Sequence, residues 1–385
     1  MGAAVAGRGR GGDRRAPRVA ACAALVLATL LGCRGAGDTK TGQPGSSDTE
    51  APAAGPDQAC PDAGHLSLRQ RLAQTLFVGV DGSSAARIAE LVDRREPVGG
   101  IFLAGTATTV FRDGTLRRLR GRPVPPLVAV DDEGGRVQRI DAVAGDLPSA
   151  TRLGRETAER VRAVAEDRGR ELARLGVTMA FAPVVDIGGH RDGDVIGDRA
   201  FSTHVAGVVR AAGAYAAGLR DAGILPTLKH FPGHGRATGD SHRGRAVTPP
   251  WSSVRGVDVA PYRALLDDGP VAVMVGHLVV PGLSAPGLPT SLDRAVYDYL
   301  RDDLDFDGLV VTDDLSRMRA ITSGWSQALA VRRALAAGAD MALLAGPMPL
   351  DRLLDDLTVD VVSGRLPRAR VAEAATRVLA AKGCG

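Results

Sequence analysis

The residues best suited to proton transfer in this 385-residue chain lie between positions 230 and 242, a segment that holds three of its seven histidines. Proline and glycine are frequent there, which excludes a regular helix and indicates a shaped loop. Asp240 lies two residues before His242, close enough to orient the imidazole and stabilise its protonated form, as a general acid/base requires. The alternative is that these side chains only stabilise the loop through local hydrogen bonds.

The same segment offers possible ligands for a metal ion. His230, His234, Asp240 and His242 all carry suitable donor atoms, and the first two show the i, i+4 spacing of zinc-binding helices. However, proline and glycine break that helix, and no glutamate follows the first histidine. We therefore expect an acid/base site that needs neither a metal nor a cofactor.

Two further positions invite a chemical role. Lys229 directly precedes the segment in a chain that has only three lysines among its 48 basic residues. A compact ammonium with a specific hydrogen-bonding task would explain its presence. Asp313 and Asp314 follow a wholly apolar run, where one carboxylate could attack an electrophilic carbon. Thr312 or Asp313 could also cap a helix that begins near Leu315.

Short apolar runs that alternate with amphipathic stretches must position these side chains. This alternation indicates an α/β fold with a parallel sheet, and eight apolar runs favour closure into a (β/α)₈ TIM-type barrel, a single catalytic domain. An open doubly wound sheet is the alternative, but no glycine-rich dinucleotide-binding motif follows the first run. The predicted strands are Thr75–Val80, Val98–Leu103, Leu127–Val130, Thr178–Val185, Leu225–Leu228, Val271–Val275, Leu309–Val311 and Met341–Leu344. The clearest predicted helices are Arg155–Leu175, Ala206–Ala222, Ser326–Ala337 and Arg368–Ala381.

Polar side chains follow five of these predicted strands. Catalytic residues of TIM barrels lie at the C-terminal ends of the strands, so we expect these side chains to meet at one mouth of the barrel. The clusters are Asp131-Asp132-Glu133, Asp186, Lys229-His230, Gly276-His277 and Asp313-Asp314.

The N-terminal region has the features of an export signal. Five arginines and one aspartate in residues 1–32 account for the whole formal net charge of +4, which removes the main support for nucleic-acid binding. Residues 19–31 form an apolar run that is short for a membrane span but typical of a signal peptide. Cys33 follows Gly32, which resembles a bacterial lipobox, although a plain signal peptide with an incidental cysteine is the alternative.

This interpretation divides the chain into a lipoprotein signal peptide (1–32), a flexible linker (33–65) rich in Gly, Ser, Thr, Pro and Asp, and a barrel domain (66–385). We expect a protein anchored by lipid at Cys33 to the outer face of the cell membrane. Cys60 and Cys384 flank the barrel domain and could pair in an oxidising compartment, the alternative being two unrelated free thiols.

Taken together, the motifs resemble glycoside hydrolase family 3, specifically its bacterial β-N-acetylglucosaminidase branch. They occur in the family order over roughly residues 66–383, and they are specific as a set although each is weak alone. The matching segments are Val130–Arg139, Phe181–Asp186, Ile196–Phe201, Lys229–Gly235 with Asp240–His242, and Thr312–Ser316.

The resemblance implies a role for each matching residue. Asp313 corresponds to the nucleophile that forms a glycosyl-enzyme, His242 to the acid/base, and Asp240 to its partner. Most retaining glycosidases pair two carboxylates, so this branch looks like an exception, with an imidazole as the acid. The residues that correspond to the sugar-binding set are Asp131, Arg139, Arg199, Lys229 and His230.

The implied function is a retaining β-N-acetylhexosaminidase that removes terminal N-acetylglucosamine from peptidoglycan fragments such as muropeptides, as a monomer and without a cofactor. A phosphorylase and a β-glucosidase-like enzyme are the alternatives within the family, and a sugar-binding lipoprotein without turnover is the alternative of another class. Two departures from the family pattern affect the expected specificity. Asp132 stands where Gln is usual and would add a carboxylate near the sugar, and after Asp314 both Arg317 and Arg319 stand where smaller or apolar residues are expected.

Overall fold

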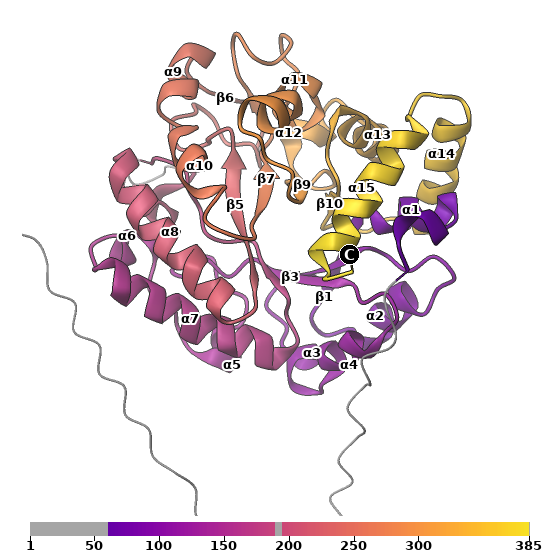
Figure 1. The fold of residues 1–385 in the computed structure, drawn as a ribbon, viewed down its shortest axis with the longest axis horizontal. Coiled ribbons are helices and arrows are strands. Elements are labelled where there is room, and N and C mark those ends of the chain that lie inside the picture. Colours follow the sequence, from indigo (N-terminus) through magenta and orange to yellow (C-terminus); the bar gives the residue numbers. More distant parts are fainter. Residues whose placement is uncertain (1–60, 189–194, 385) are drawn as a thin grey trace, which may run out of the picture. The chain divides into compact units, whose positions relative to one another are not determined.

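Eight parallel strands form the central sheet in a computed structural model of the chain (Figure 1), which describes residues 61–188 and 195–384. Neighbouring strands pair in the order β10-β1-β2-β3-β4-β5-β7-β9. A parallel bridge between Val311 and Met341 joins the two outer strands, so the sheet closes on itself. The strands are β1 Leu76–Asp81, β2 Gly100–Ala104, β3 Leu127–Val130, β4 Met179–Ala180, β5 Leu225–Phe231, β7 Ala272–Val275, β9 Val310–Thr312 and β10 Ala342–Leu344.

This arrangement confirms the predicted TIM-type barrel, and each of the eight predicted strands corresponds to an observed one. Two of them differ from their predicted length by three residues or more. The strand predicted over Thr178–Val185 is regular only in β4, and beyond Pro183, which has no backbone N–H to donate, the pairing with β5 consists of an isolated bridge between Val184 and Lys229. Strand β5 instead extends to Phe231, so Lys229 and His230 lie on the strand end rather than in the loop.

Helices surround the barrel, and α7 and α8 lie side by side along one side of it (Figure 1). Thr157 caps the first of them by accepting a hydrogen bond from the Arg160 backbone N–H, which satisfies an otherwise unpaired donor. The helices are α1 Leu68–Gln74, α2 Ala85–Val92, α3 Thr109–Arg112, α4 Thr115–Arg118, α5 Asp141–Ala144, α6 Ala150–Leu153, α7 Ala158–Leu175, α8 Val205–Asp221, α9 Trp251–Gly256, α10 Ala260–Leu265, α11 Arg294–Asp298, α12 Arg319–Thr322, α13 Gln327–Ala337, α14 Leu350–Val362 and α15 Arg368–Ala381.

The side chains of each strand alternate between the barrel interior and the layer of surrounding helices. One buried cluster fills the interior, where Phe181 packs against Phe77 and Phe102 with ring centroids 5.5 and 5.3 Å apart. The intervening strand residues, such as Val128 and Val130, belong to a second cluster with the helices. This alternation decides which residues beyond each strand can reach the barrel mouth.

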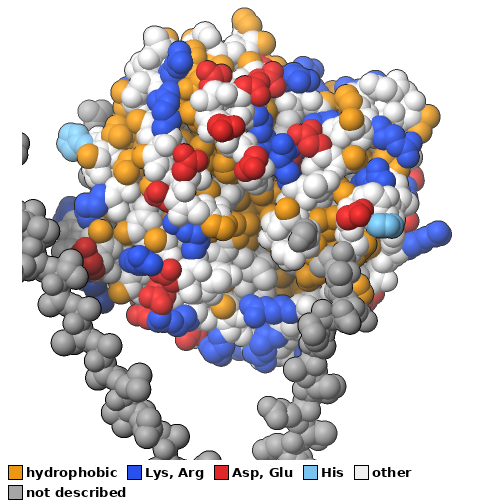
Figure 2. Space-filling model, viewed as in Figure 1, with side chains coloured by type: hydrophobic (Ala, Val, Ile, Leu, Met, Phe, Trp, Pro, Cys, Tyr) orange, Lys and Arg blue, Asp and Glu red, His pale blue; other side chains and the backbone are white. Residues whose placement is uncertain are grey.

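The charged surface gives no sign of a strongly basic face in the view of Figure 2, where acidic and basic side chains occur near one another. None of the helices in the described part of the chain is long and apolar enough to cross a membrane. The predicted signal peptide and Cys33 lie outside the described residues.

Candidate active site

A cavity of about 260 Å³ lies at the C-terminal ends of the barrel strands. Interior side chains of the barrel, including Phe102, Phe181, Met274 and Leu343, form its apolar base. The structure brings seven of the eight predicted catalytic and sugar-binding residues to its wall: Asp131, Arg139, Arg199, Lys229, His230, His242 and Asp313. The eighth, Asp240, contacts the cavity-lining His242 from behind.

Strand alternation explains why three of these residues point inward. Asp131 lies two residues beyond the interior Ala129, and Asp313 lies two beyond the interior Val311. Lys229 occupies the inward face near the end of β5. Since a period of two returns each side chain to the same face, the interior pattern of β3, β5 and β9 continues directly into the cavity wall.

Glu133 holds the cationic side of the cavity together. Its carboxylate accepts two hydrogen bonds from the Arg199 guanidinium, at 2.6 and 2.8 Å, and lies 2.5 Å from Lys229 Nζ. Burial alone would raise the pKa of Glu133, but Arg199 and Lys229 outweigh this effect and lower it. Lys229 also donates to Asp131 at 2.6 Å. Two cations are therefore fixed at the cavity wall by carboxylates from the β3 end.

His230 is oriented from both sides of its ring. Nδ1 lies 2.7 Å from Asp186 Oδ2, and Nε2 lies 3.4 Å from an Arg199 nitrogen. Because a guanidinium can only donate, the neutral ring accepts at Nε2 and carries its proton on Nδ1, which donates to Asp186. Asp186 also accepts from the His234 backbone N–H at 2.6 Å, so one buried carboxylate fixes the end of β5 and the start of the following loop.

Asp313 presents a charged carboxylate to the cavity. Its Oδ1 accepts a hydrogen bond of 2.8 Å from the Asp314 backbone N–H. Burial tends to raise the pKa of this carboxyl, but His277, His230 and the Asp314 N–H outweigh it and lower the pKa to about 2. His277 is itself fixed, with Nε2 3.0 Å from the Asp314 carbonyl oxygen and Nδ1 2.7 Å from Ser291 Oγ. The carboxylate is therefore ionised at any ordinary pH.

His242 is the exposed member of the site. Its side chain is 61% exposed, and Nδ1 lies 3.0 Å from Asp240 Oδ1, which also accepts from the His242 backbone N–H. Between them, Ser241 is buried, with its hydroxyl 3.0 Å from His234 Nε2 and its carbonyl accepting from the Ala320 N–H. The loop is thus anchored at its centre, while the imidazole faces the cavity and solvent.

Arg139 has free donor capacity toward the cavity. One terminal nitrogen donates to the Gln138 carbonyl at 3.1 Å, whereas its buried Nε has no hydrogen-bond partner among the described residues. No carboxylate in the described part of the chain forms an ion pair with it, in contrast to Lys229 and Arg199. A bound polar ligand would supply the missing acceptor.

The expectation that Asp132 adds a carboxylate near the sugar is wrong. Asp132 does not line the cavity, because it lies one residue out of phase with Asp131 and points toward the helices. There its carboxylate lies 2.9 Å from Arg168 Nε of α7, with both side chains almost completely buried. Asp132 Oδ1 also accepts from the Arg139 backbone N–H at 3.1 Å, so it supports the loop that carries Arg139.

The possible metal ligands do not converge. His230 pairs with Asp186, His234 with Ser241, and His242 with Asp240. The His230 and His234 rings lie 6.0 Å apart between centroids. Within residues 61–188 and 195–384, no group of three or more His, Cys, Asp or Glu side chains is arranged to hold a metal ion.

Several residues of this network received no role from the sequence, namely Glu133, Asp186, His277, Ser241 and Arg168. Four of them belong to motifs at strand ends or to the histidine-rich loop, so their positions marked them as candidates. Arg168 had no such signal, because it lies within a long helix among many other arginines.

Cys384 is disulfide-bonded and lies against Ala63, Ala375 and Leu379. Cys60, its predicted partner, is outside the described residues, and the pairing stays a prediction.

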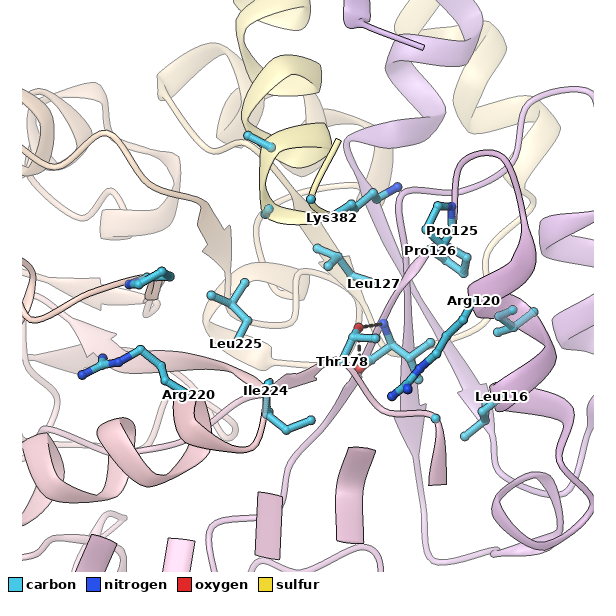
Figure 3. Close-up of a pocket in the computed structure, with 18 residues that line it drawn as sticks. Leu116, Arg120, Pro125, Pro126, Leu127, Thr178, Arg220, Ile224, Leu225 and Lys382 are labelled. Atoms are coloured by element: carbon cyan, nitrogen blue, oxygen red, sulfur yellow. Dashed lines mark hydrogen bonds between the residues drawn. The ribbon is translucent and has the colours of Figure 1, made fainter. Parts of the chain in front are cut away.

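A larger cavity of about 640 Å³ lies at the opposite end of the barrel, beside the first residues of β3 and β5 (Figure 3). Its wall is mainly apolar, with Arg120, Arg220 and Lys382 as the charged side chains. Burial lowers the pKa of Lys382 to about 7. None of the predicted catalytic or sugar-binding residues lines this cavity, and active sites of TIM barrels lie at the other end.

Comparison with known proteins places this geometry in a family. Residues 67–381 match the glycosyl hydrolase family 3 N-terminal domain. Beta-hexosaminidase LpqI of Mycobacterium tuberculosis is 43% identical over 378 residues, covering 95% of this chain and 96% of that protein. A glycosyl hydrolase of family GH3 from Mycobacterium smegmatis superposes with a TM-score of 0.79 at 45% identity, covering 83% of this chain and 98% of that one. Beta-N-acetylhexosaminidase from Beutenbergia cavernae superposes with a TM-score of 0.75 at 31% identity, covering 83% and 99%. The chain therefore belongs to glycoside hydrolase family 3.

Proposed function

We propose that this protein is a retaining β-N-acetylhexosaminidase that hydrolyses terminal, non-reducing β-linked N-acetylglucosamine. The observation that carries the proposal is the pairing of an ionised carboxylate, Asp313, with the imidazole of His242 in the wall of one cavity. The names of its relatives, a beta-hexosaminidase and a beta-N-acetylhexosaminidase, support the same activity.

The two groups divide the reaction between them. In the first step, the Asp313 carboxylate attacks the anomeric carbon while His242 gives a proton to the departing glycosidic oxygen, which leaves a glycosyl ester on Asp313. In the second step, His242 takes a proton from water as the water oxygen attacks the anomeric carbon and releases Asp313. Asp240 keeps the imidazole oriented through both steps.

The remaining wall residues bind the sugar. Lys229 and His230 are fixed by Asp131, Glu133 and Asp186, so they lose little conformational freedom when they bind hydroxyl groups. The buried, unpaired Nε of Arg139 offers a further donor to a polar substituent. Because the base of the cavity is apolar, water is displaced where the ring binds.

A direct test compares aryl N-acetylglucosaminide with aryl glucoside, each with and without inorganic phosphate. The proposal predicts faster release from the N-acetylglucosaminide, free sugar as the product and no loss of activity in a chelator. Preference for the glucoside, or a sugar 1-phosphate as the main product, would point to the other members of the family. A sugar-binding protein without turnover would release no aryl group.

We further propose that the enzyme acts as a monomer on peptidoglycan fragments outside the cell, anchored by lipid at Cys33. The apolar run 19–31 followed by Gly32 and Cys33 supports the lipid anchor. The full chain expressed in a bacterium should fractionate with membranes, and Cys33→Ser should move the activity to the soluble fraction. Equal membrane association of both forms would exclude this anchor.

A further inference from the structure

Arg317 lies where the catalytic cavity meets a second cavity of about 430 Å³. The two cavities share Ala104, Gly105, Arg317 and Ala345 in their walls. Arg317 is the one charged residue of these four. A substrate that occupies both cavities therefore passes next to its guanidinium.

The backbone that carries Arg317 is held firmly. Ser316 donates to Asp314 Oδ1 through its backbone N–H at 2.9 Å and through its hydroxyl at 2.5 Å, and Ser316 Oγ accepts from the Gly346 N–H at 2.7 Å. The Arg317 side chain lies over Gly346, where a Cβ would approach its Cγ and Nε to 3.3 Å. These contacts hold the first part of the Arg317 side chain in place, although the residue as a whole is exposed. Arg317 follows Asp313 by four residues in the sequence.

Arg317 has no anionic partner in the described part of the chain. Within the described ranges, no carboxylate, carbonyl or hydroxyl oxygen forms a hydrogen bond or an ion pair with its guanidinium. The other arginine of the second cavity, Arg87, pairs with Glu90 at 2.5 Å. Asp81, the carboxylate in that wall, accepts instead from the Ser83 backbone N–H at 2.9 Å. The positive charge of Arg317 is therefore available to a ligand.

We propose that Arg317 forms an oxyanion-binding subsite next to the sugar cavity and favours substrates whose aglycone carries a carboxylate. A guanidinium presents a planar pair of donors that matches a carboxylate or phosphate. The second cavity is larger than the sugar cavity, so it suits an organic group better than a free ion. The inference rests on the proposed function, because the sugar in the first cavity fixes where the aglycone begins.

The test uses two aryl N-acetylglucosaminides that differ only in a ring carboxylate or its neutral carboxamide. The ratio of kcat/KM for the two substrates cancels most effects common to both. We expect Arg317→Met to lower the carboxylate-to-carboxamide ratio by about threefold to tenfold, and Arg317→Lys to retain part of the preference. The wild-type preference should also weaken at high ionic strength.

Arg319→Met is the matched control. Arg319 lies two residues after Arg317, carries the same charge, is exposed, and lines neither cavity. Its carboxylate-to-carboxamide ratio should equal that of the wild type. Thermal unfolding midpoints of all variants show whether a change reflects folding instead of binding.

The outcomes separate this inference from the proposed function. If the wild type is active on both substrates and Arg317→Met leaves the carboxylate-to-carboxamide ratio of kcat/KM unchanged, Arg317 does not bind a carboxylate of the aglycone. The anion that remains to be tested is then phosphate. Phosphate is tested as the anion by measuring the release of the aryl group and of sugar 1-phosphate at increasing phosphate concentrations. If the wild type and Arg319→Met respond to phosphate and Arg317→Met does not, the subsite binds the phosphate acceptor. If neither arm responds, the subsite is excluded. Absence of wild-type activity on both substrates would instead overturn the proposed function.

Discussion

Asp313 combines the charge and the access that a nucleophile needs. Its pKa is lowered to about 2 despite burial, because His277, His230 and the Asp314 N–H favour the charged form. His242 differs in being largely exposed and in pairing with the Asp240 carboxylate. The two environments suit two different tasks, since a nucleophile must stay ionised whereas an acid/base must gain and lose a proton.

At this scale, Asp240 acts through His242 and not on the substrate itself. We expect His242→Ala to lower kcat by about 10²- to 10⁴-fold, the usual contribution of general acid/base catalysis, and Asp240→Ala to lower it less. The double variant should be no slower than His242→Ala alone, because the carboxylate has nothing left to orient. The measurement is kcat for an aryl N-acetylglucosaminide.

Azide provides the control for this prediction, because it can attack the glycosyl-enzyme without a general base. It should restore part of the rate of His242→Ala and yield a glycosyl azide. Fully additive losses in the double variant would show that Asp240 acts independently of His242.

The elements of the barrel position the site through alternation and through buried ion pairs. Asp131 and Glu133 continue the inward face of β3, whereas Asp132 faces α7 and meets Arg168. One short segment thus serves both the sugar cavity and the packing of a helix against the barrel. The Asp132–Arg168 pair also supports the Arg139 backbone.

Removing one partner of this pair should be costly. Arg168→Met leaves the Asp132 carboxylate buried without its cation, and we expect a loss of about 3–5 kcal/mol in the free energy of unfolding. Arg162→Met is a matched control on the same helix, since Arg162 is 55% exposed and pairs with Asp221 at the surface, where the loss should stay below about 1 kcal/mol.

Urea unfolding measures both variants. The double variant Asp132→Asn with Arg168→Met should recover part of the stability, because no buried charge remains uncompensated. Equal losses in Arg168→Met and Arg162→Met would contradict the importance given to the buried pair.

For the whole molecule, the buried carboxylates predict how stability depends on pH. Glu133, Asp186 and Asp313 have lowered pKa values in the folded state, because neighbouring cations and hydrogen bonds outweigh burial. The folded protein therefore binds fewer protons than the unfolded chain below the ordinary carboxyl pKa of about 4. Their stabilising effect is complete above that pH and is lost as the pH falls toward about 2 for Asp313.

We accordingly expect the thermal unfolding midpoint to fall steeply between about pH 4 and pH 2. Asp132 and Asp258, whose pKa values are raised by burial, act in the opposite direction but are two groups against three. Glu133→Gln should be less stable than the wild type at pH 7 and should lose less on acidification. A midpoint that stays constant down to pH 3 in both proteins would contradict this account.

Much of the fold was predictable because its signals are local. Apolar runs and helical periodicity marked all eight strands, and polar residues after strand ends marked the cavity wall. The prediction that Asp132 lies near the sugar was wrong, because it was based on the position of Asp132 in a motif and not on the face of the strand to which its side chain points. The Arg168 partner could not be predicted, since a tertiary ion pair leaves no mark in a helix rich in arginine.

The central claim is that Asp313 forms a covalent bond with the sugar. It is tested most directly by incubating the enzyme with a 5-fluoro N-acetylglucosaminyl fluoride, which slows both steps, and by mass spectrometry of the digested protein. The account predicts one added fluorinated sugar on the peptide that contains Asp313, and none in Asp313→Asn. Labelling of another residue such as Asp131, or turnover of the compound without any label on Asp313, would contradict it.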